Sequence, residues 1–384
     1  MHNFKVAVVG AGPAGCSAAL VLARAGFRTI LIEKSPLPRS KTCGGGLVLR
    51  ARKFLDIEID AVVEDVCHRV NLFFNDLELS FSITRNYPII TTVMRDKFDY
   101  LLTQKAADAG ASIQSECLVE KITQDGKNVL LHTRNDQIRS EWVILAEGAG
   151  GHLAKNSGWS ESRLLLPGLE CELTTPDAEF KGFSNTARFD FGFIPAGYAW
   201  IFPKKKHLSV GVLCMKKGTA NLRKYLAAYL QHIFAENFKI NNSSVFFIPI
   251  IPRRDLFVRD RILLVGDSAG LADPISGEGI SNAILSGQLA ARALIETESH
   301  PKKICQLYTN YLKEHILKDL KLARKLAHIF YFSPRIRNRI FRRYGNEMVR
   351  GMTSVLSGEH SYSDLIYDPR SYLKLVTHYF RLKN

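Results

Sequence analysis

The sequence predicts an α/β fold, α+β overall, in which a parallel-sheet domain is interrupted by an antiparallel β-rich unit and followed by a helical C-terminal tail. Three observations predict this class. Short buried strands ending in glycine-rich loops recur near residues 4, 142 and 261. Alternating, aromatic-rich segments at 163–214 indicate antiparallel strands. A helical pattern rich in lysine and arginine follows residue 301.

The chain begins with a strand–helix–strand pattern. Phe4–Val9 is short and rich in β-branched residues, which is typical of a buried parallel strand. Pro13–Ala25 begins with proline and mixes Ala and Leu with small residues, so we expect a helix packed closely on a sheet and ended by Gly26. Phe27–Ile32 is the second strand, and together the segments have the length of a βαβ unit.

The loop between the first strand and the helix has the sequence Gly10-Ala11-Gly12-Pro13-Ala14-Gly15. Its first glycine allows a tight turn, the second lets the backbone approach a pyrophosphate, and the third allows close helix–strand contact. Glu33, followed by Lys34, ends the second strand 18 residues after Gly15, where an acid can accept hydrogen bonds from a ribose hydroxyl. These residues predict a Rossmann-like dinucleotide site, which on this loop alone could hold NAD or FAD.

Two later strands also end in glycine loops. Trp142–Ala146 precedes Glu147-Gly148, and Arg261–Val265 precedes Gly266-Asp267. Asp267 is placed to bond the ribityl chain of a flavin, although an Asp at this point can equally cap a helix. A second glycine loop, Pro274-Ile275-Ser276-Gly277-Glu278-Gly279-Ile280, opens a helix that we expect to reach Ile295. Its N-terminal dipole would face the flavin edge that carries negative charge on reduction, which favours FAD.

These segments predict a discontinuous domain organisation. We expect an FAD-binding domain from residues 1–70, 95–160 and 255–300, in which Asp96–Gly110 is a helix. A substrate domain would comprise 71–94 and 161–254, and a basic helical C-terminal region would comprise 301–384.

As a set, Gly10–Gly15, Arg95, Gly266-Asp267 and Pro274–Ile280 resemble the flavoproteins with a para-hydroxybenzoate-hydroxylase-like fold. Within that group the chain is most similar to the geranylgeranyl reductase family. The residues that carry this likeness are Lys41-Thr42-Cys43-Gly44-Gly45-Gly46 and Gly197-Tyr198-Ala199-Trp200-Ile201-Phe202-Pro203-Lys204. The likeness spans roughly Lys5 to Ala293, and the C-terminal tail lies outside it.

The resemblance implies an enzyme that reduces C=C bonds of isoprenoid chains by hydride transfer from reduced FAD. It also implies that Arg95 and the Cys43-Gly44 loop contact FAD. Tyr198, Trp200 and Phe202 would then line the pocket for the prenyl chain, and aromatic faces suit an extended hydrocarbon. Taken singly, Tyr198 and Trp200 are nearly as compatible with ordinary core packing.

Cys43 is the candidate catalytic residue. A thiol in a glycine loop close to the cofactor could give a proton to the carbon opposite hydride delivery. The alternative is a small buried thiol that only packs against the ring.

The electron donor is left open. Aromatic hydroxylases of this fold carry an Asp-Gly motif that helps with NADPH, and Glu147-Gly148 stands in the corresponding place with a longer acid. NAD(P)H is therefore a possible donor. The rival functions are a flavin monooxygenase acting on an aromatic or polyene substrate, and a non-catalytic flavin-binding protein at a membrane.

Composition restricts the other classes. The seven cysteines form no CxxC pair and the eleven histidines show no metal spacing, so we expect free thiols, no metal site and a cytoplasmic location. The net charge is +15, and residues 301–384 carry 17 basic against 6 acidic side chains. This tail resembles no nucleic-acid module, so we expect no nucleic-acid partner. It could hold the enzyme against the inner face of an anionic membrane or bind the head of a prenyl or lipid substrate.

Overall fold

A computed structural model describes residues 3–216, 221–298 and 300–367. Its main sheet is built as the first strand pattern predicts. The central strand β1 (Asn3–Val9) pairs in parallel with β2 (Thr29–Ile32) and with β11 (Gln137–Leu145). The sheet continues in parallel to β8 (Ser112–Gln114) and β18 (Ile262–Leu264), and antiparallel to β17 (Val258–Arg259), β10 (Asn128–Thr133) and β9 (Val119–Asp125).

Two predicted strand boundaries differ from the structure for local reasons. β11 begins at Gln137 rather than Trp142, because its first residues pair with the antiparallel β10 hairpin. β2 begins at Thr29 rather than Phe27, because the Arg28 carbonyl accepts hydrogen bonds from both Lys5 and Val6.

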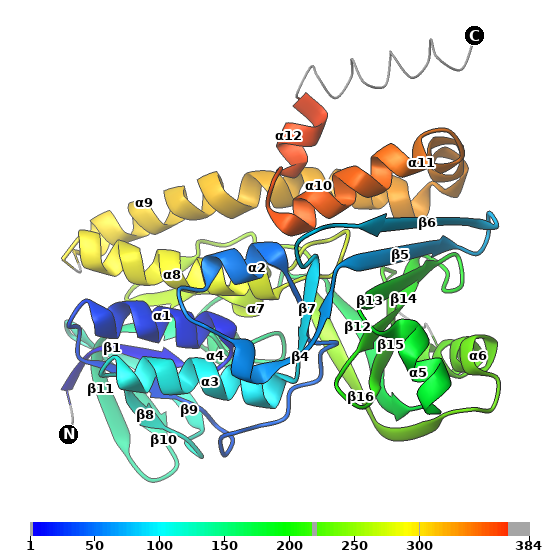
Figure 1. Ribbon diagram of the computed structural model, residues 1–384. Coiled ribbons are helices and arrows are strands. Elements are labelled where there is room, and N and C mark those ends of the chain that lie inside the picture. The colour runs from blue at the N-terminus through cyan, green and yellow to red at the C-terminus, as the bar shows by residue number, and fades with distance from the viewer. Residues whose placement is uncertain (1–2, 217–220, 299, 368–384) are drawn as a thin grey trace.

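Helices α1 (Pro13–Arg24) and α8 (Ile280–Glu296) pack closely against each other beside this sheet, with α3 (Arg95–Asp108) next to α1 (Figure 1). A Cβ on Gly287 would lie 2.1 Å from the Ala14 carbonyl oxygen, so only glycine allows this approach. The close packing places the two glycine loops that open α1 and α8 beside each other. Short helices complete the layer: α2 (Leu49–Phe54), α4 (Leu153–Asn156), α7 (Gly266–Ala269) and the 3₁₀ turn Asp60–Val62.

A second, seven-stranded sheet forms the other half of the molecule. Its order is β16 (Lys239–Pro249), β12 (Leu165–Thr174), β15 (Leu208–Cys214), β14 (Gly197–Pro203), β13 (Thr186–Phe191), β5 (Arg69–Phe74) and β6 (Leu79–Thr84). Every pair is antiparallel except β13–β5. Helices α5 (Asp177–Phe183) and α6 (Leu222–Phe234) pack on this sheet around a separate hydrophobic cluster.

A three-stranded sheet of β3 (Gly46–Val48), β7 (Ile90–Val93) and β4 (Val63–Cys67) joins the two halves. It takes strands from both sides of the boundary expected at residue 70. The domain boundaries therefore stay a prediction.

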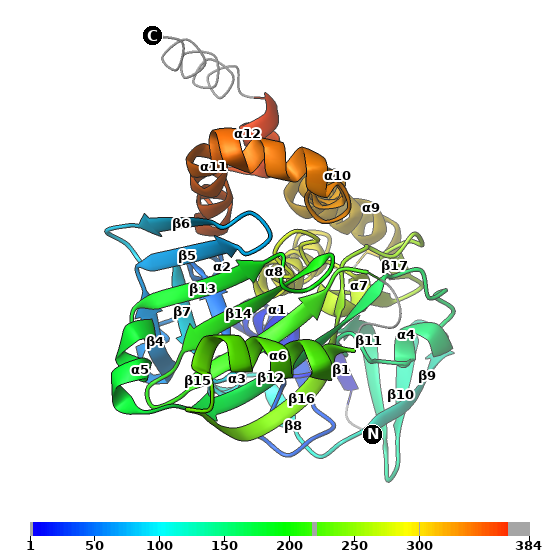
Figure 2. The same cartoon turned by 90° about the vertical axis from the view of Figure 1, so that its right-hand side faces the viewer.

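The C-terminal region is helical as expected, through α9 (Pro301–Leu312), a π-helical turn Lys313–Leu317, α10 (Lys318–Phe332), α11 (Pro334–Ser357) and α12 (Tyr362–Tyr367). These helices lie across the top of α8 and β6 in both views (Figures 1 and 2). Residues 368–384, part of the expected basic region, lie outside the described residues. Within the part of the chain described, no helix is long and apolar enough to cross a membrane.

Candidate active site

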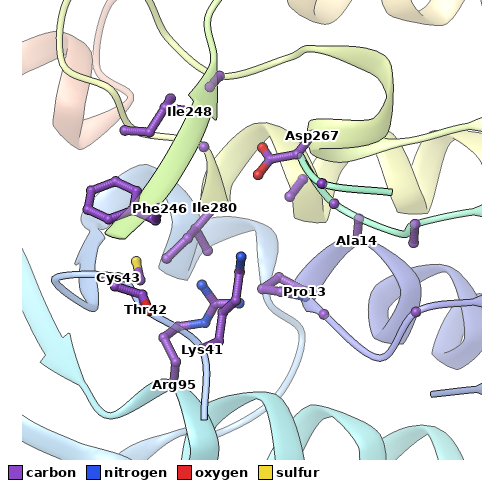
Figure 3. A pocket seen from close by; sticks show the side chains of 18 of the residues that line it. Pro13, Ala14, Lys41, Thr42, Cys43, Arg95, Phe246, Ile248, Asp267 and Ile280 are labelled. Carbon is purple, nitrogen blue, oxygen red and sulfur yellow. The ribbon is translucent and has the colours of Figure 1, made fainter. Parts of the chain in front are cut away.

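A cavity of about 500 Å³ lies where the two halves of the molecule meet, and both glycine loops line it. Its remaining walls come from the Arg39–Gly46 segment, from the aromatic strand β14 and from the end of β16. Figure 3 shows Lys41 and Arg95 reaching into it from one side and Asp267 from the other.

The first glycine loop is shaped by backbone contacts. Gly10 has φ +108°, and a Cβ there would lie 2.3 Å from the Ala146 carbonyl oxygen. A Cβ on Gly15 would lie 1.9 Å from the Gly10 carbonyl oxygen. By contrast, a Cβ on Gly12 would meet only the Arg39 side chain, at 3.7 Å, because the backbone there faces the open cavity. This is the approach that a pyrophosphate requires.

Glu33 is buried at the end of β2 and is bound on three sides. It accepts hydrogen bonds from Ala11 N (2.9 Å) and Ser35 N (3.1 Å) and pairs with Arg39 Nε at 3.1 Å. Arg39 also pairs with Asp99, which holds Arg95 through two bonds of 2.8 Å. Arg95 is therefore oriented from within its own helix, with its guanidinium at the cavity wall.

Cations gather at one end of the cavity, and this end suits a diphosphate. Enclosure in the cavity and the nearby Arg95 lower the pKa of Lys41. Burial raises the pKa of Asp267, against the opposing effect of Lys41 and Arg95. Lys41, Arg39 and Arg95 thus gather positive charge next to the open backbone at Gly12. A bound anion would relieve the repulsion among these cations.

The second glycine loop is held by three tyrosines from distant segments. Asp273 Oδ1 accepts hydrogen bonds from Ile275 N (2.8 Å), Ser276 N (2.9 Å) and Tyr362 Oη (3.3 Å). Tyr331 Oη of α10 donates to the Ile275 carbonyl at 2.5 Å, and Tyr198 Oη donates to the Ser276 carbonyl. Two C-terminal helices therefore help to shape the loop that opens α8.

Alternate residues of β14 present an aromatic wall to the cavity. Tyr198, Trp200 and Phe202 lie on one face of the strand, and Trp200 packs edge-on against Phe246 of β16 with ring centroids 6.1 Å apart. Trp200 is 5% exposed, and its indole Nε1 has no hydrogen-bond partner among the residues that the structure describes. Apart from this N–H and the Tyr198 hydroxyl, which is bonded to the Ser276 carbonyl, the wall is apolar and suits a hydrocarbon chain.

Cys43 lies between this wall and the cation cluster, with its sulfur directed into the cavity (Figure 3). Gly45 N donates to Cys43 Sγ at 3.4 Å, and the Arg95 guanidinium also lies within hydrogen-bonding reach of the thiol. Behind the loop, the buried Lys204 Nζ donates to the carbonyls of Gly44 and Val93, both at 2.8 Å. A Cβ on Gly44 would lie 2.7 Å from Trp200 Nε1. The loop is thus held tightly against β14.

Most residues predicted for the site line this one cavity. They are Gly10, Gly12, Pro13, Ala14, Glu33, Lys34, Cys43, Gly44, Arg95, Glu147, Gly148, Tyr198, Trp200, Phe202, Asp267, Gly277, Gly279 and Ile280. Gly15, Gly266 and Pro274 are absent from the lining and act as packing or turn residues behind it.

Glu147 has a structural task. Its two carboxylate oxygens accept hydrogen bonds from Leu153 N and Ala154 N, each at 2.9 Å, at the start of α4.

Sequence reasoning missed Arg39, Lys41, Lys204 and Arg163. Arg163 is buried and donates to the carbonyls of Ala149 and Asp267, so it ties two cavity loops together. Lys41 lies in the Lys41–Gly46 segment that carries the family likeness. Arg39 and Lys41 stand just before its glycines, and two cations in this place are a signal for an anion-binding site. Lys204 ends the Gly197–Lys204 stretch that carries the likeness, but nothing in that stretch indicated its contacts with the Cys43 loop. Arg163 lies in a sequence with no motif.

These features fit FAD: a glycine cradle open at Gly12, a cluster of cations beside it, and a carboxylate, Asp267, at the far end. Among the described residues, no group of His, Cys, Asp and Glu side chains could hold a metal ion.

Comparison with known proteins agrees with this geometry. Residues 3–164 match the FAD binding domain family. The chain is 28% identical to a geranylgeranyl diphosphate reductase of Nicotiana tabacum, over 92% of this chain and 80% of that protein. It is also 28% identical to digeranylgeranylglycerophospholipid reductase 3 of Methanosphaera stadtmanae, over 87% and 88%.

Solved structures share the whole fold. A geranylgeranyl bacteriochlorophyll reductase-like protein from Thermoplasma acidophilum superposes with a TM-score of 0.78 at 21% identity, covering 98% of this chain and all of that one. A flavin-dependent brominase gives 0.76 at 20% identity, covering both chains completely. The predicted fold, the FAD cofactor and the resemblance to geranylgeranyl reductases are confirmed.

Proposed function

We propose that this FAD-dependent oxidoreductase, a homologue of the geranylgeranyl reductases, reduces C=C bonds of an isoprenoid chain carried by a lipid, quinone or prenyl diphosphate. The observation that carries the proposal is that the aromatic wall of Tyr198, Trp200 and Phe202 and the Cys43 thiol line the same cavity as the glycine cradle. A prenyl chain on this wall would lie between a thiol and the cofactor.

The cofactor, the thiol and the aromatic side chains would each perform a different part of the reduction. FAD, when bound and reduced, would supply the hydride that one carbon of the double bond receives. Cys43 Sγ would give a proton to the other carbon, and the Arg95 guanidinium lies within hydrogen-bonding reach of the sulfur. The aromatic side chains exclude water and align the chain, which places the reacting carbon against the thiol.

A monooxygenase remains the second candidate, because a p-nitrophenol 4-monooxygenase shares the fold with a TM-score of 0.70 at 16% identity. The apolar wall and the thiol favour reduction over oxygen insertion. NAD(P)H as electron donor also stays a proposal. Glu147 stands where the hydroxylases carry the acid that helps with NADPH, but both of its carboxylate oxygens accept backbone hydrogen bonds at the start of α4.

We further propose that the turn between α10 and α11 rests on an anionic membrane. Phe332 and Ile336 are 45% and 53% exposed there, and Arg335 and Arg339 are exposed beside them. Apolar side chains among cations are the pattern of an interfacial anchor. The protein should pellet with vesicles containing phosphatidylglycerol but not with pure phosphatidylcholine vesicles, and high salt should release it. Equal pelleting with both would contradict this assignment.

The function is tested by anaerobic turnover. The purified yellow protein, reduced with dithionite, is given geranylgeranyl diphosphate or digeranylgeranylglycerophospholipid, and the products are weighed by mass spectrometry. Products that gain pairs of hydrogens support the reductase. In a parallel reaction under air, products that gain oxygen support the monooxygenase.

The variant Cys43→Ala tests the thiol. It should retain FAD and lose turnover by about a hundredfold or more. Cys305→Ala, a change in α9 away from the cavity, is the matched control and should leave the rate unchanged. Full activity of Cys43→Ala would eliminate the proton-donor role.

A further inference from the structure

A second, smaller cavity of about 90 Å³ lies on the other side of the Cys43 loop. It shares Ser40, Lys41, Thr42, Cys43 and Arg95 with the main cavity. One segment of backbone, residues 40–43, therefore forms a wall between the two spaces. The remaining lining is polar and comes from the start of α3 and from two strands: Met94, Asp96, Glu170, Cys171, Glu172, Asn242, Ser243 and Ser244.

Glu170 is the buried acid in this side cavity. It lies on β12, is 4% exposed, and its Oε1 accepts a 2.5 Å hydrogen bond from Ser209 Oγ. The backbone N–H of Cys43 is close enough to the Glu170 carboxyl to lower the pKa of that carboxyl. Glu170 thus lies directly behind the residue whose thiol faces the main cavity, and no step proposed above uses it.

Glu170 is also set up to carry a proton at neutral pH. Burial raises the pKa of its carboxyl, and the negative charge of Glu172 on the same strand raises it further. Lys204, from the end of β14, opposes this only in part, since burial lowers the pKa of its own ammonium.

The other charged groups around the side cavity are already engaged or face elsewhere. Glu172 pairs with His207 Nε2 at 2.8 Å. Arg95 from α3 is bound by Asp99, while Lys41 points into the main cavity. Burial raises the pKa of Cys171, which therefore stays a neutral thiol. Asp96, in the first turn of α3, is half-buried and accepts a hydrogen bond from Lys97 N at 2.8 Å.

We propose that Glu170 returns the proton to Cys43 through water held in the side cavity. The inference rests on the proposed reductase function, in which Cys43 loses its proton. When the substrate is reduced, the Cys43 S–H bond breaks and a C–H bond forms at the carbon opposite the hydride. The Cys43 thiolate then gains a proton as the Glu170 O–H bond breaks, and Glu170 takes a proton from solvent at the cavity mouth. With substrate and cofactor filling the main cavity, this route reaches the thiol from behind.

Kinetics distinguish this role from a structural one. In Glu170→Gln, the first turnover needs no proton from residue 170, so a first turnover of the dithionite-reduced enzyme with geranylgeranyl diphosphate should proceed at the wild-type rate. Later turnovers should slow by about tenfold or more, which gives a burst of one product per enzyme. Glu170→Asp should restore part of the steady rate. A variant whose loop is merely displaced would lose the first turnover as well.

Glu172→Gln is the matched control on the same strand. It removes the negative charge that raises the pKa of Glu170, so the fall in wild-type turnover with rising pH should move to lower pH, without a burst. In Glu170→Gln that limb of the pH profile should disappear.

A measurement without substrate separates the relay from the reductase function. The FAD-loaded, oxidised protein, with its main cavity filled by a fully saturated prenyl diphosphate that cannot be reduced, is diluted into D₂O. The conversion of the Cys43 S–H band to S–D is then followed in infrared spectra, with Cys43→Ala subtracted. Exchange should be about tenfold or more slower in Glu170→Gln than in wild type and recover in Glu170→Asp. Equal exchange rates overturn the proposal. Slower exchange in a protein that reduces no prenyl substrate would support the proton route and reject the reductase function.

Discussion

Replacing Glu170 by Gln removes a buried carboxyl while keeping the shape of the side chain, so its effect on folding should depend on pH. An acid whose pKa is higher in the folded than in the unfolded state binds more protons when folded. Between those two pKa values, the wild-type protein therefore loses stability as the pH rises. The amide of the Glu170→Gln variant cannot ionise, so the variant escapes this loss.

The size of the effect follows from the environment of Glu170. Burial, with the charge of Glu172, raises the pKa of the carboxyl from 4.5 to about 7. At 1.36 kcal/mol for each pKa unit, ionising this carboxyl costs the folded state about 3 kcal/mol once the pH exceeds 7. The free energy of unfolding of the variant, relative to wild type, should therefore improve by up to about 3 kcal/mol between pH 4.5 and pH 8.

Urea unfolding at saturating FAD, followed by circular dichroism at several pH values, measures this difference. Glu64→Gln is a control of opposite sign. Although burial acts against it, the hydrogen bond from Lys97 lowers the pKa of Glu64, so its contribution is present at neutral pH and fades in acid. Parallel pH curves for wild type and Glu170→Gln would refute the claim that Glu170 is protonated in the folded protein near neutrality.

Two further variants test the glycine loops. Gly12→Ala should fold normally, because its Cβ meets only a side chain at 3.7 Å, but a fluorescence titration should show FAD binding about tenfold weaker. Gly15→Ala should fail to fold stably, because its Cβ would lie 1.9 Å from a backbone oxygen. Tyr331→Phe should lower the free energy of unfolding by about 1 kcal/mol and weaken FAD binding, because the Ile275 carbonyl loses its donor. Tyr311→Phe removes an exposed hydrogen bond to Glu296 and should change neither the free energy of unfolding nor FAD binding.

The glycine loops and the parallel strands were predictable because their chemistry is local. Gly10, Gly12 and Gly15 stand at fixed spacing between a strand and a helix, and steric contacts within a few residues determine what each can be. The aromatic wall was predictable for a similar reason, since alternate residues of one strand share a face. Such local patterns can be recognised in the sequence without knowledge of the rest of the fold.

The support behind Cys43 was not predictable, because it depends on pairing between distant strands. Glu170 meets Ser209 only because β12 pairs with β15, and it meets the Cys43 loop only because the two halves of the molecule close on each other. The tyrosines around the second glycine loop are similar. Tyr331 and Tyr362 lie more than fifty residues beyond it, in helices whose sequence shows only an amphipathic, basic pattern.

Lys204 shows how this long-range support reaches the loop that carries the Cys43 thiol. Its buried ammonium satisfies the carbonyls of Gly44 and Val93 and partly balances Glu170 and Glu172. Lys204→Met should therefore leave two carbonyls without donors and lower the free energy of unfolding by about 3 kcal/mol.

The double variant Lys204→Met with Glu170→Gln tests whether the charges are coupled. Removing Glu170 also removes a carboxylate that Lys204 balanced, so at pH 8 the double variant should be more stable than the sum of the single effects by about 1 kcal/mol or more. The excess should shrink at pH 5, where Glu170 is protonated in either background. Strict additivity at both pH values would mean that Lys204 acts on the Cys43 loop through its hydrogen bonds alone.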